Sequence, residues 1–182
     1  MRKVASILFA TTVALSTGLV SAAPAAAAVS TGCRWVKGYG SFKPALPKSG
    51  AKTKVKPTFR ITAAGLGECN GGGVTRGTLV ATLKAGVAGN CTSLAHDVDM
   101  HFAGTAKITW NTKATSQITT AKMTPIPHPQ NTQMRLTGKV TSGKFAGATL
   151  TSDIKLTSAD HGCENDGLVK VNIRSARPLT IK

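Results

Sequence analysis

Hydrophobic and polar residues alternate with a period of two along most of the chain after residue 28, where helical periodicity is weak. The alternation is clearest at residues 78–87 and recurs at 105–110, 133–140, 150–156 and 168–174, and more weakly at 59–63. This pattern is typical of β-strands with one buried face. The residues expected to face the core are Phe59, Ile61, Ala63, Leu79, Ala81, Leu83, Ala85, Val87, Ala106, Ile108, Trp110, Met134, Leu136, Val140, Phe145, Leu150, Ile154, Leu156, Val169, Val171 and Ile173.

Turn-forming residues separate the predicted strands. Runs rich in glycine, asparagine, aspartate or serine lie at 71–73, 88–90, 141–144 and 160–162. Residues 123–133 contain three prolines and are expected to form a loop or a sheet edge, because proline donates no backbone hydrogen bond. The fold class predicted from these features is all-β, an antiparallel β-sandwich or barrel of about seven to nine strands.

The composition indicates one folded domain. Hydrophobic residues make up 41% of the 182 residues, which is too high a fraction for a disordered chain. The 19 glycines do not follow the three-residue repeat of collagen. We therefore assign residues 29–182 to a single β-rich domain.

Residues 1–28 have the three parts of a secretory signal peptide. Two basic residues precede an apolar stretch at 4–20, and small residues follow up to Ala28, the favoured cleavage site. Two alternatives are an uncleaved membrane anchor, for which the apolar stretch is short, and lipidation of Cys33. We expect a secreted or extracellular protein, associated with the cell wall and without a transmembrane anchor after cleavage.

Four cysteines, Cys33, Cys69, Cys91 and Cys163, all lie in the part of the chain expected to be exported. An even number of cysteines in an oxidising compartment predicts two disulfides, and four cysteines allow three connectivities. We favour Cys33–Cys69 and Cys91–Cys163. The sequence contains no close C-x-x-C pair, so a structural zinc site is not expected.

The charge of the chain is strongly positive. There are 23 Lys and Arg against 7 Asp and Glu, a formal net charge of +16, and removal of residues 1–28 leaves 21 against 7, or +14. The basic residues of the predicted strands fall on outward faces, where they either solvate the surface and protect sheet edges or attract polyanions. The residues assigned to polyanion binding are Lys43, Lys48, Lys52, Lys54, Lys56, Arg135, Lys139, Lys155, Lys170 and Arg174.

The expected partners in the second interpretation are anionic polymers outside the cell. Cell-wall polymers come first, with lipid head groups and extracellular nucleic acid as other candidates. Residues 43–56 support the interpretation, with five lysines and two prolines in 14 residues. Aromatic residues make up only 4% of the chain, so sequence-specific recognition of nucleic acid is not expected.

Acidic residues and histidines are concentrated near two of the cysteines. If residues 96–101 form a strand, Asp97, Asp99 and His101 share one face and are candidate ligands for a divalent metal. The alternative is a pair of polar loops, and no cofactor is assigned. The carboxylates that a Cys91–Cys163 disulfide would add to this end are Asp160, Glu164 and Asp166.

Motifs of known catalytic machinery are not present in the sequence. It has no G-x-S-x-G turn, no H-E-x-x-H pair and no glycine-rich phosphate loop, so no catalytic residue is assigned. We expect a secreted, non-enzymatic binding or structural module at the cell surface, with affinity for anionic polymers. The alternative is an extracellular hydrolase or metal-dependent enzyme that uses the His/Asp-rich end near Cys91 and Cys163.

An ordered set of motifs carries a resemblance to known proteins. These are Cys33, GECNGGGVTRGT at 67–78, GNCTSL at 89–94, GTAKITWN at 104–111, GKVTSGKFAG at 138–147 and Gly162-Cys163. The set resembles a family of small secreted proteins of actinobacteria, over residues 33–175. The resemblance implies export and a β-rich fold and supplies no catalytic residue. This chain differs in its many lysines, where threonine and serine are more typical of the family.

Overall fold

The computed structural model describes residues 30–48, 50, 55–96, 99–127, 132–159 and 167–182. The predicted signal peptide, residues 1–28, lies outside them. The strands are β1 (Thr31–Leu46), β2 (Thr58–Asn70), β3 (Arg76–Ala85), β4 (Phe102–Trp110), β5 (Thr115–Ile126), β6 (Thr132–Gly143), β7 (Thr149–Ser158), β8 (Leu168–Ser175) and β9 (Leu179–Ile181), with one helix, α1 (Cys91–His96), in the described part of the chain. No helix in these ranges has the length and apolar character needed to cross a membrane.

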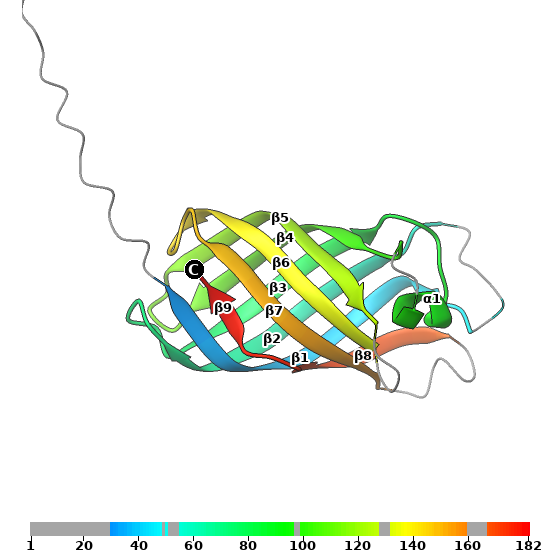
Figure 1. Ribbon diagram of the computed structural model, residues 1–182, viewed down its shortest axis with the longest axis horizontal. Helices are drawn as coiled ribbons and strands as arrows, with labels where there is room; N and C mark the ends of the chain where they lie inside the picture. Colours follow the sequence, from blue (N-terminus) through cyan, green and yellow to red (C-terminus); the bar gives the residue numbers. More distant parts are fainter. Residues whose placement is uncertain (1–29, 49, 51–54, 97–98, 128–131, 160–166) are drawn as a thin grey trace, which may run out of the picture.

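The strands form a closed antiparallel barrel (Figure 1). Each of β1 to β7 pairs with the next strand along the chain, and β8 pairs back onto β1 to close the ring. The all-β prediction is confirmed, and of the two architectures considered the structure is the barrel. A barrel of eight strands is just wide enough for side chains to fill its interior.

The gap between β7 and β1 is filled by two short strands, β8 and β9. Strand β8 pairs with residues 37–46 of β1, and β9 pairs with residues 31–33. The chain leaves the sheet between them at residues 176–178, where Pro178 lies. At this break the Val36 N–H donates to the hydroxyl of Ser175 at 3.2 Å, which replaces a backbone partner.

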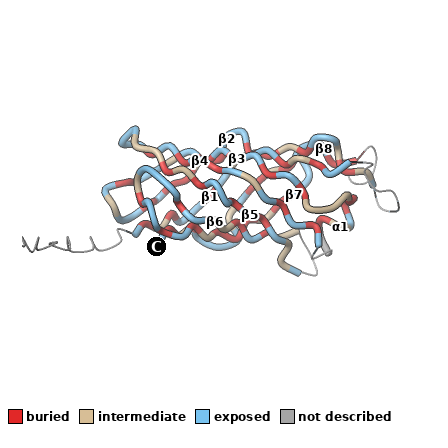
Figure 2. Tube along the Cα trace, turned by 90° about the horizontal axis from the view of Figure 1, so that it is seen from above, coloured by how far each residue is buried: buried red, intermediate tan, exposed pale blue. Residues whose placement is uncertain are grey.

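Inward-facing side chains fill the barrel, and buried and exposed residues alternate along its strands (Figure 2). At one end of β4, Phe102 packs with Phe42 and Phe59, with ring centroids 4.7 to 6.1 Å apart. At the other end Trp110 meets Phe145 edge to face at 5.4 Å. The predicted core positions of Trp110 and Phe145 are confirmed.

Two residues expected in the core are exposed, and a third, Val87, only packs against the core from its edge. Ala63 is exposed because β2 shifts register between Ile61 and Ala64, so that Ala64 faces inward instead. Val169 is 42% exposed. The pairing of β1 with β8 is irregular before the Leu46 and Leu168 pair, and Leu168 faces inward in place of Val169. Val87 follows the end of β3 and is only partly buried.

The pairing of β5 explains how it accommodates proline. Pro125 lies opposite Met134 of β6, and the pairing of β5 with β4 ends at Met123. Pro125 is therefore on an open strand edge, where its missing N–H breaks no ladder bond. Of the two predictions for residues 123–133, the edge is confirmed for 124–126, whereas 128–131 lie outside the described residues.

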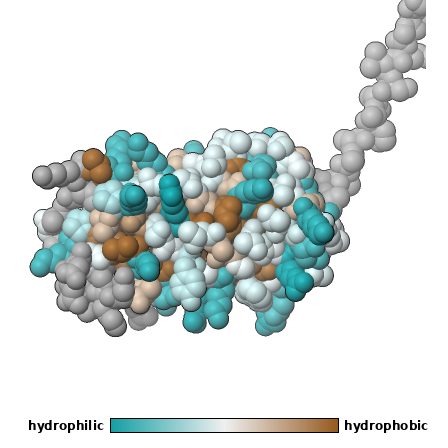
Figure 3. Space-filling model, turned by 180° about the vertical axis from the view of Figure 1, so that it is seen from behind, coloured by the Kyte–Doolittle hydropathy of each residue, from teal (hydrophilic) through white to brown (hydrophobic). Residues whose placement is uncertain are grey.

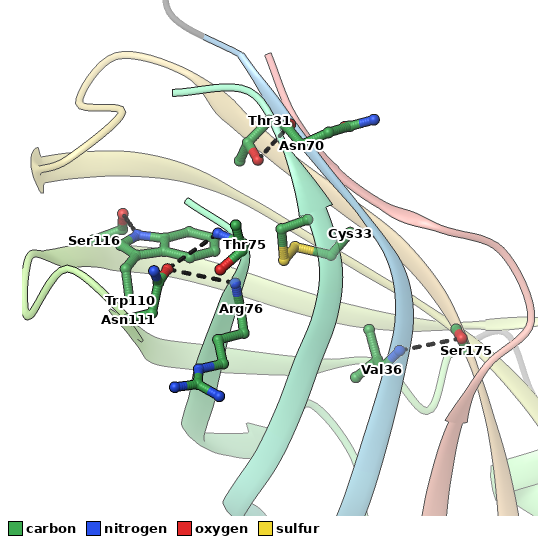
Figure 4. Close-up of a disulfide and its surroundings, with 11 residues drawn as sticks. Thr31, Cys33, Val36, Asn70, Thr75, Arg76, Trp110, Asn111, Ser116 and Ser175 are labelled. Atoms are coloured by element: carbon green, nitrogen blue, oxygen red, sulfur yellow. Dashed lines mark hydrogen bonds between the residues drawn. A yellow bond between two sulfur atoms is a disulfide. The ribbon is translucent and has the colours of Figure 1, made fainter. Parts of the chain in front are cut away.

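The Cys33–Cys69 disulfide is confirmed. The two residues lie directly opposite each other in the β1–β2 register, and the bond links the two strands at one end of the barrel (Figure 4). Cys91 is also disulfide-bonded. Cys163 lies outside the described residues, so the Cys91–Cys163 bridge remains a prediction.

Candidate functional site

Three cations lie side by side on the outer face of the barrel. Lys37 of β1 is directly opposite Arg174 of β8, and Arg174 is directly opposite Lys155 of β7. Adjacent strands are about 4.8 Å apart, so the row spans about 10 Å. We call Lys37, Arg174 and Lys155 the cationic row.

No described carboxylate neutralises the cationic row. Like charges directly opposite each other on neighbouring strands are destabilising. The nearest carboxylate along β7, Asp153, is already bound by Arg135 and Arg177. None of the row's three residues makes an ion pair with a residue that the structure describes. The row therefore retains a concentrated positive charge that an external anion can satisfy.

Edge protection does not explain the cationic row. Lysines often guard open sheet edges against pairing with other chains. Here β1, β8 and β7 each have paired neighbours on both sides, so the row lies in the continuous wall of the barrel. Edge protection therefore does not account for the basic residues at these three positions.

Two exposed aromatic side chains flank the row along β1. Trp35 and Tyr39 lie two residues before and after Lys37, and their exposed fractions are 40% and 64%. Tyr39 is opposite Asn172 of β8. Trp35 and Tyr39 line a shallow depression of about 520 Å³ together with Asn172 and Arg174. A second depression, of about 270 Å³, extends from Arg174 toward β7.

Glycines on β2 determine how Trp35 lies. Trp35 is opposite Gly67, and its indole covers Gly67 so closely that a Cβ there would overlap the ring. The neighbouring outward position on β2, Gly65, also lies within contact distance of the indole. One side of the ring is thus packed on backbone, and the ring forms a flat platform at the surface.

The structure gathers only part of the predicted polyanion set. Lys155 and Arg174 belong to the cationic row, and Lys170 lies on the same face, opposite Ser41. Arg135 is instead paired with Asp153. The other members are Lys43, Lys48, Lys56 and Lys139, which are exposed at other places on the barrel, and Lys52 and Lys54, which lie outside the described residues.

Sequence reasoning missed Lys37, Trp35 and Tyr39. The alternation was present, because these three residues face outward while Val36 between them is buried. Gly38 and Gly40 occupy the following inward positions, and glycine does not register as a hydrophobic residue. The hydrophobic pattern therefore did not predict strand β1, although the alternation of its outward residues is present in the sequence.

The prediction of a strand at 96–101 is wrong. Helix α1 ends at His96, and a turn occurs at Asp99. The helix begins after Asn90, whose side-chain oxygen accepts the Ser93 N–H at 2.8 Å as an N-cap.

The metal assignment stays a prediction. Asp99 and His101 are exposed, and Asp97 lies outside the described residues. Within the described ranges no group of three metal-ligating side chains occurs. The other carboxylates expected at this end, Asp160, Glu164 and Asp166, also lie outside those ranges.

Another depression lies over β2 to β5, with a volume of about 300 Å³. Its cations, Arg60 and Lys107, are on β2 and β4 and are separated by β3. Seen from behind, the molecule shows small apolar areas between hydrophilic side chains (Figure 3). The outer face over β2 to β5 has no row of adjacent cations in the described strands. We therefore favour the face formed by β1, β8 and β7 as the candidate site.

An ion-pair cluster borders the candidate site. Asp153 is 7% exposed, and its carboxylate accepts two hydrogen bonds from Arg135, at 2.8 and 3.0 Å. Arg177 lies 3.6 Å from the same carboxylate, and its backbone N–H donates to the Asp153 carbonyl at 3.1 Å. Asp153 thereby connects the break between β8 and β9 to β6 and β7.

The hydrogen bond from Arg135 is the main reason that the pKa of Asp153 lies below its ordinary value of 3.8. Burial acts in the opposite direction, and the charges of Arg135 and Arg177 lower the pKa further. Since the pKa is lower in the folded chain, the ionised carboxylate contributes its full stabilisation above the unfolded value. This stabilisation is lost as the pH falls through the folded value.

Asp153→Asn is expected to lower the free energy of unfolding at neutral pH by about 1–2 kcal/mol, because a buried carboxylate loses its charge-assisted hydrogen bonds to Arg135. The variant should also lose less stability than the wild type on acidification below about pH 4, because its amide does not titrate. Thermal melts at neutral and acid pH measure both effects. Equal losses on acidification in the two proteins would contradict the assignment.

Comparison with protein-family models, with curated proteins and with solved structures found no match. The resemblance to small secreted proteins thus remains an expectation from the motifs. The candidate site is interpreted from its own geometry and charge.

Proposed function

We propose that this chain is an exported, non-enzymatic module that binds an anionic polymer on the cationic row. The observation that carries the proposal is the direct cross-strand alignment of Lys37, Arg174 and Lys155 without a described carboxylate partner. Like charges directly opposite each other lower the stability of the fold. Such destabilising arrangements are often found at functional sites.

The shape and overall charge of the protein support a polymer rather than a small ligand. The depressions over the row are only partly enclosed, whereas small-molecule sites enclose most of their ligand. The formal net charge of +14 that remains after removal of residues 1–28 adds a long-range attraction for any polyanion. Export fits the Cys33–Cys69 disulfide, because such bonds persist in oxidising compartments, and the proposal includes the second bridge, Cys91–Cys163.

The test replaces Lys37, Lys155 and Arg174 together with glutamine. Binding to poly-L-glutamate at about 50 mM salt should weaken roughly tenfold or more, because three adjacent charges that displace counterions are removed. Titration calorimetry measures the affinity, and repetition across salt concentrations measures the salt slope, which should become shallower in the variant.

A second triple variant controls for net charge. Replacing Lys84, Lys107 and Lys122 with glutamine removes the same charge from exposed positions on β3, β4 and β5. This control should keep most of the wild-type affinity, and the row variant should be at least as stable as the wild type because its like charges are gone. Equal weakening in both variants, or a wild type that does not bind, overturns the proposal.

A further inference from the structure

Two aromatic side chains on the proposed polymer-binding face have no structural partner for much of their surface. Trp110 and the described phenylalanines are buried in the barrel, whereas Trp35 and Tyr39 are left partly in water. Both lie on the outward side of β1, and both line the depression that contains Arg174. Large aromatic surfaces exposed next to unpaired cations are typical of binding sites rather than of inert surface.

The two aromatic residues lie along one strand, whereas the cations lie across three neighbouring strands. Trp35 and Tyr39 are four residues apart on one strand, which separates them by about 13 Å along β1. The cationic row starts at Lys37, between the two aromatic residues, and extends from β1 across β8 to β7. A ligand lying along β1 therefore meets an aromatic platform, a concentrated positive charge and a second aromatic ring in that order.

The polar residues beside the row can recognise hydroxyl groups. Asn172 lies opposite Tyr39, and Thr157 of β7 lies opposite Asn172. An amide and a hydroxyl both donate and accept hydrogen bonds, which suits the hydroxyls of a sugar ring. The C–H face of a sugar ring carries partial positive charge and stacks on the negative face of an aromatic ring. Arg174 provides a planar donor fork for a carboxylate or sulfate.

We infer that the ligand is an anionic polysaccharide, with sugar rings stacked on Trp35 and Tyr39 and an acidic substituent held by the cationic row. This inference rests on the proposed function and specifies its ligand. A single-stranded nucleic acid fits less well, because it carries a phosphate at every base and is bound by a positive groove that follows its backbone. Here the positive charge is one short row that starts between two separated aromatic rings and runs across the strands.

The test compares two carboxylate polymers that differ in their backbone, polygalacturonate and poly-L-glutamate. The wild type should bind polygalacturonate roughly tenfold more tightly, because stacking adds to charge. Tyr39→Ser and Trp35→Leu should each remove most of this preference and leave the affinity for poly-L-glutamate unchanged. Val80→Ser, which alters an exposed apolar residue of β3, serves as the control and should keep the preference.

Two features keep the test decisive if one variant folds poorly. Tyr39 is opposite Ala63 and covers no glycine, so Tyr39→Ser should fold even if Trp35→Leu uncovers Gly67. The fluorescence of exposed Trp35 should also change on adding polygalacturonate, whereas buried Trp110 should not respond.

Each outcome separates this inference from the proposed function. Equal binding of the two polymers by the wild type, or an undiminished preference in Tyr39→Ser, overturns the polysaccharide assignment while charge-driven binding stands. Tighter binding of oligothymidylate than of polygalacturonate, dependent on Trp35, identifies nucleic acid as the ligand and also overturns it. Failure to bind either carboxylate polymer rejects the proposed function itself.

Discussion

Phe59→Ala is expected to lower the free energy of unfolding by about 3–5 kcal/mol. Phe59 is 0% exposed and lies at the centre of the aromatic cluster, with its ring 4.7 Å from Phe42 and 6.1 Å from Phe102. Removing the ring loses its transfer free energy and leaves a cavity that paired strands cannot easily close. Urea denaturation followed by circular dichroism measures the change.

Gly40 of β1 provides an internal check on this result. A Cβ at Gly40 would overlap the Phe59 ring, so Gly40→Ala should destabilise the wild type through overpacking, by about 1–3 kcal/mol. Combined with Phe59→Ala, the added methyl enters the vacated space, and the double variant should be more stable than the sum of the single effects predicts. Strict additivity would show that the two residues do not share this space.

Replacing Cys33 and Cys69 together with alanine should cost about 3–4 kcal/mol of unfolding free energy. The bond closes a loop with a sequence separation of 36 residues, and its loss gives conformational entropy back to the unfolded chain. The bond also anchors the strand that presents Trp35, two residues from Cys33. The midpoint of urea unfolding under non-reducing conditions gives the magnitude.

The same double variant tests the second disulfide. Without reduction, the variant should take up no thiol-alkylating reagent if Cys91 and Cys163 are bonded to each other, and mass spectrometry detects any adduct. An unchanged urea midpoint in the variant would refute the stabilising role of Cys33–Cys69. An alkylated Cys163 would refute the predicted Cys91–Cys163 bridge.

Because the barrel wall is rigid, a loss of stability affects ligand binding only through the fraction of folded protein. Arg174 and Lys155 are held in place by β8 and β7, and Lys37 by β1, so no loop has to be ordered when a ligand binds. Binding groups on regular strands keep their spacing and lose little conformational entropy on association. Variants in the core are therefore expected to reduce binding only through loss of the folded population.

The alternation of residues along single strands was enough to predict the all-β class, the buried position of Trp110, and the outward direction of Lys155, Lys170 and Arg174. Such predictions succeed because the direction of a side chain depends on its own strand, with a period of two. They fail where a strand slips by one residue, as at Ala63, or where glycine hides the pattern, as in β1.

The composition of the chain also determined its strong positive charge, whereas the pairing of Cys33 with Cys69 was one of three possible connectivities until the structure showed the bond. Only the tertiary structure decided between sandwich and barrel and placed Arg174 and Lys155 beside Lys37, the residue that lies between Trp35 and Tyr39 on β1. The physical reason is the register between strands. The pairing of β1 with β8 joins segments from opposite ends of the chain, and no local pattern specifies which residues will stand opposite each other.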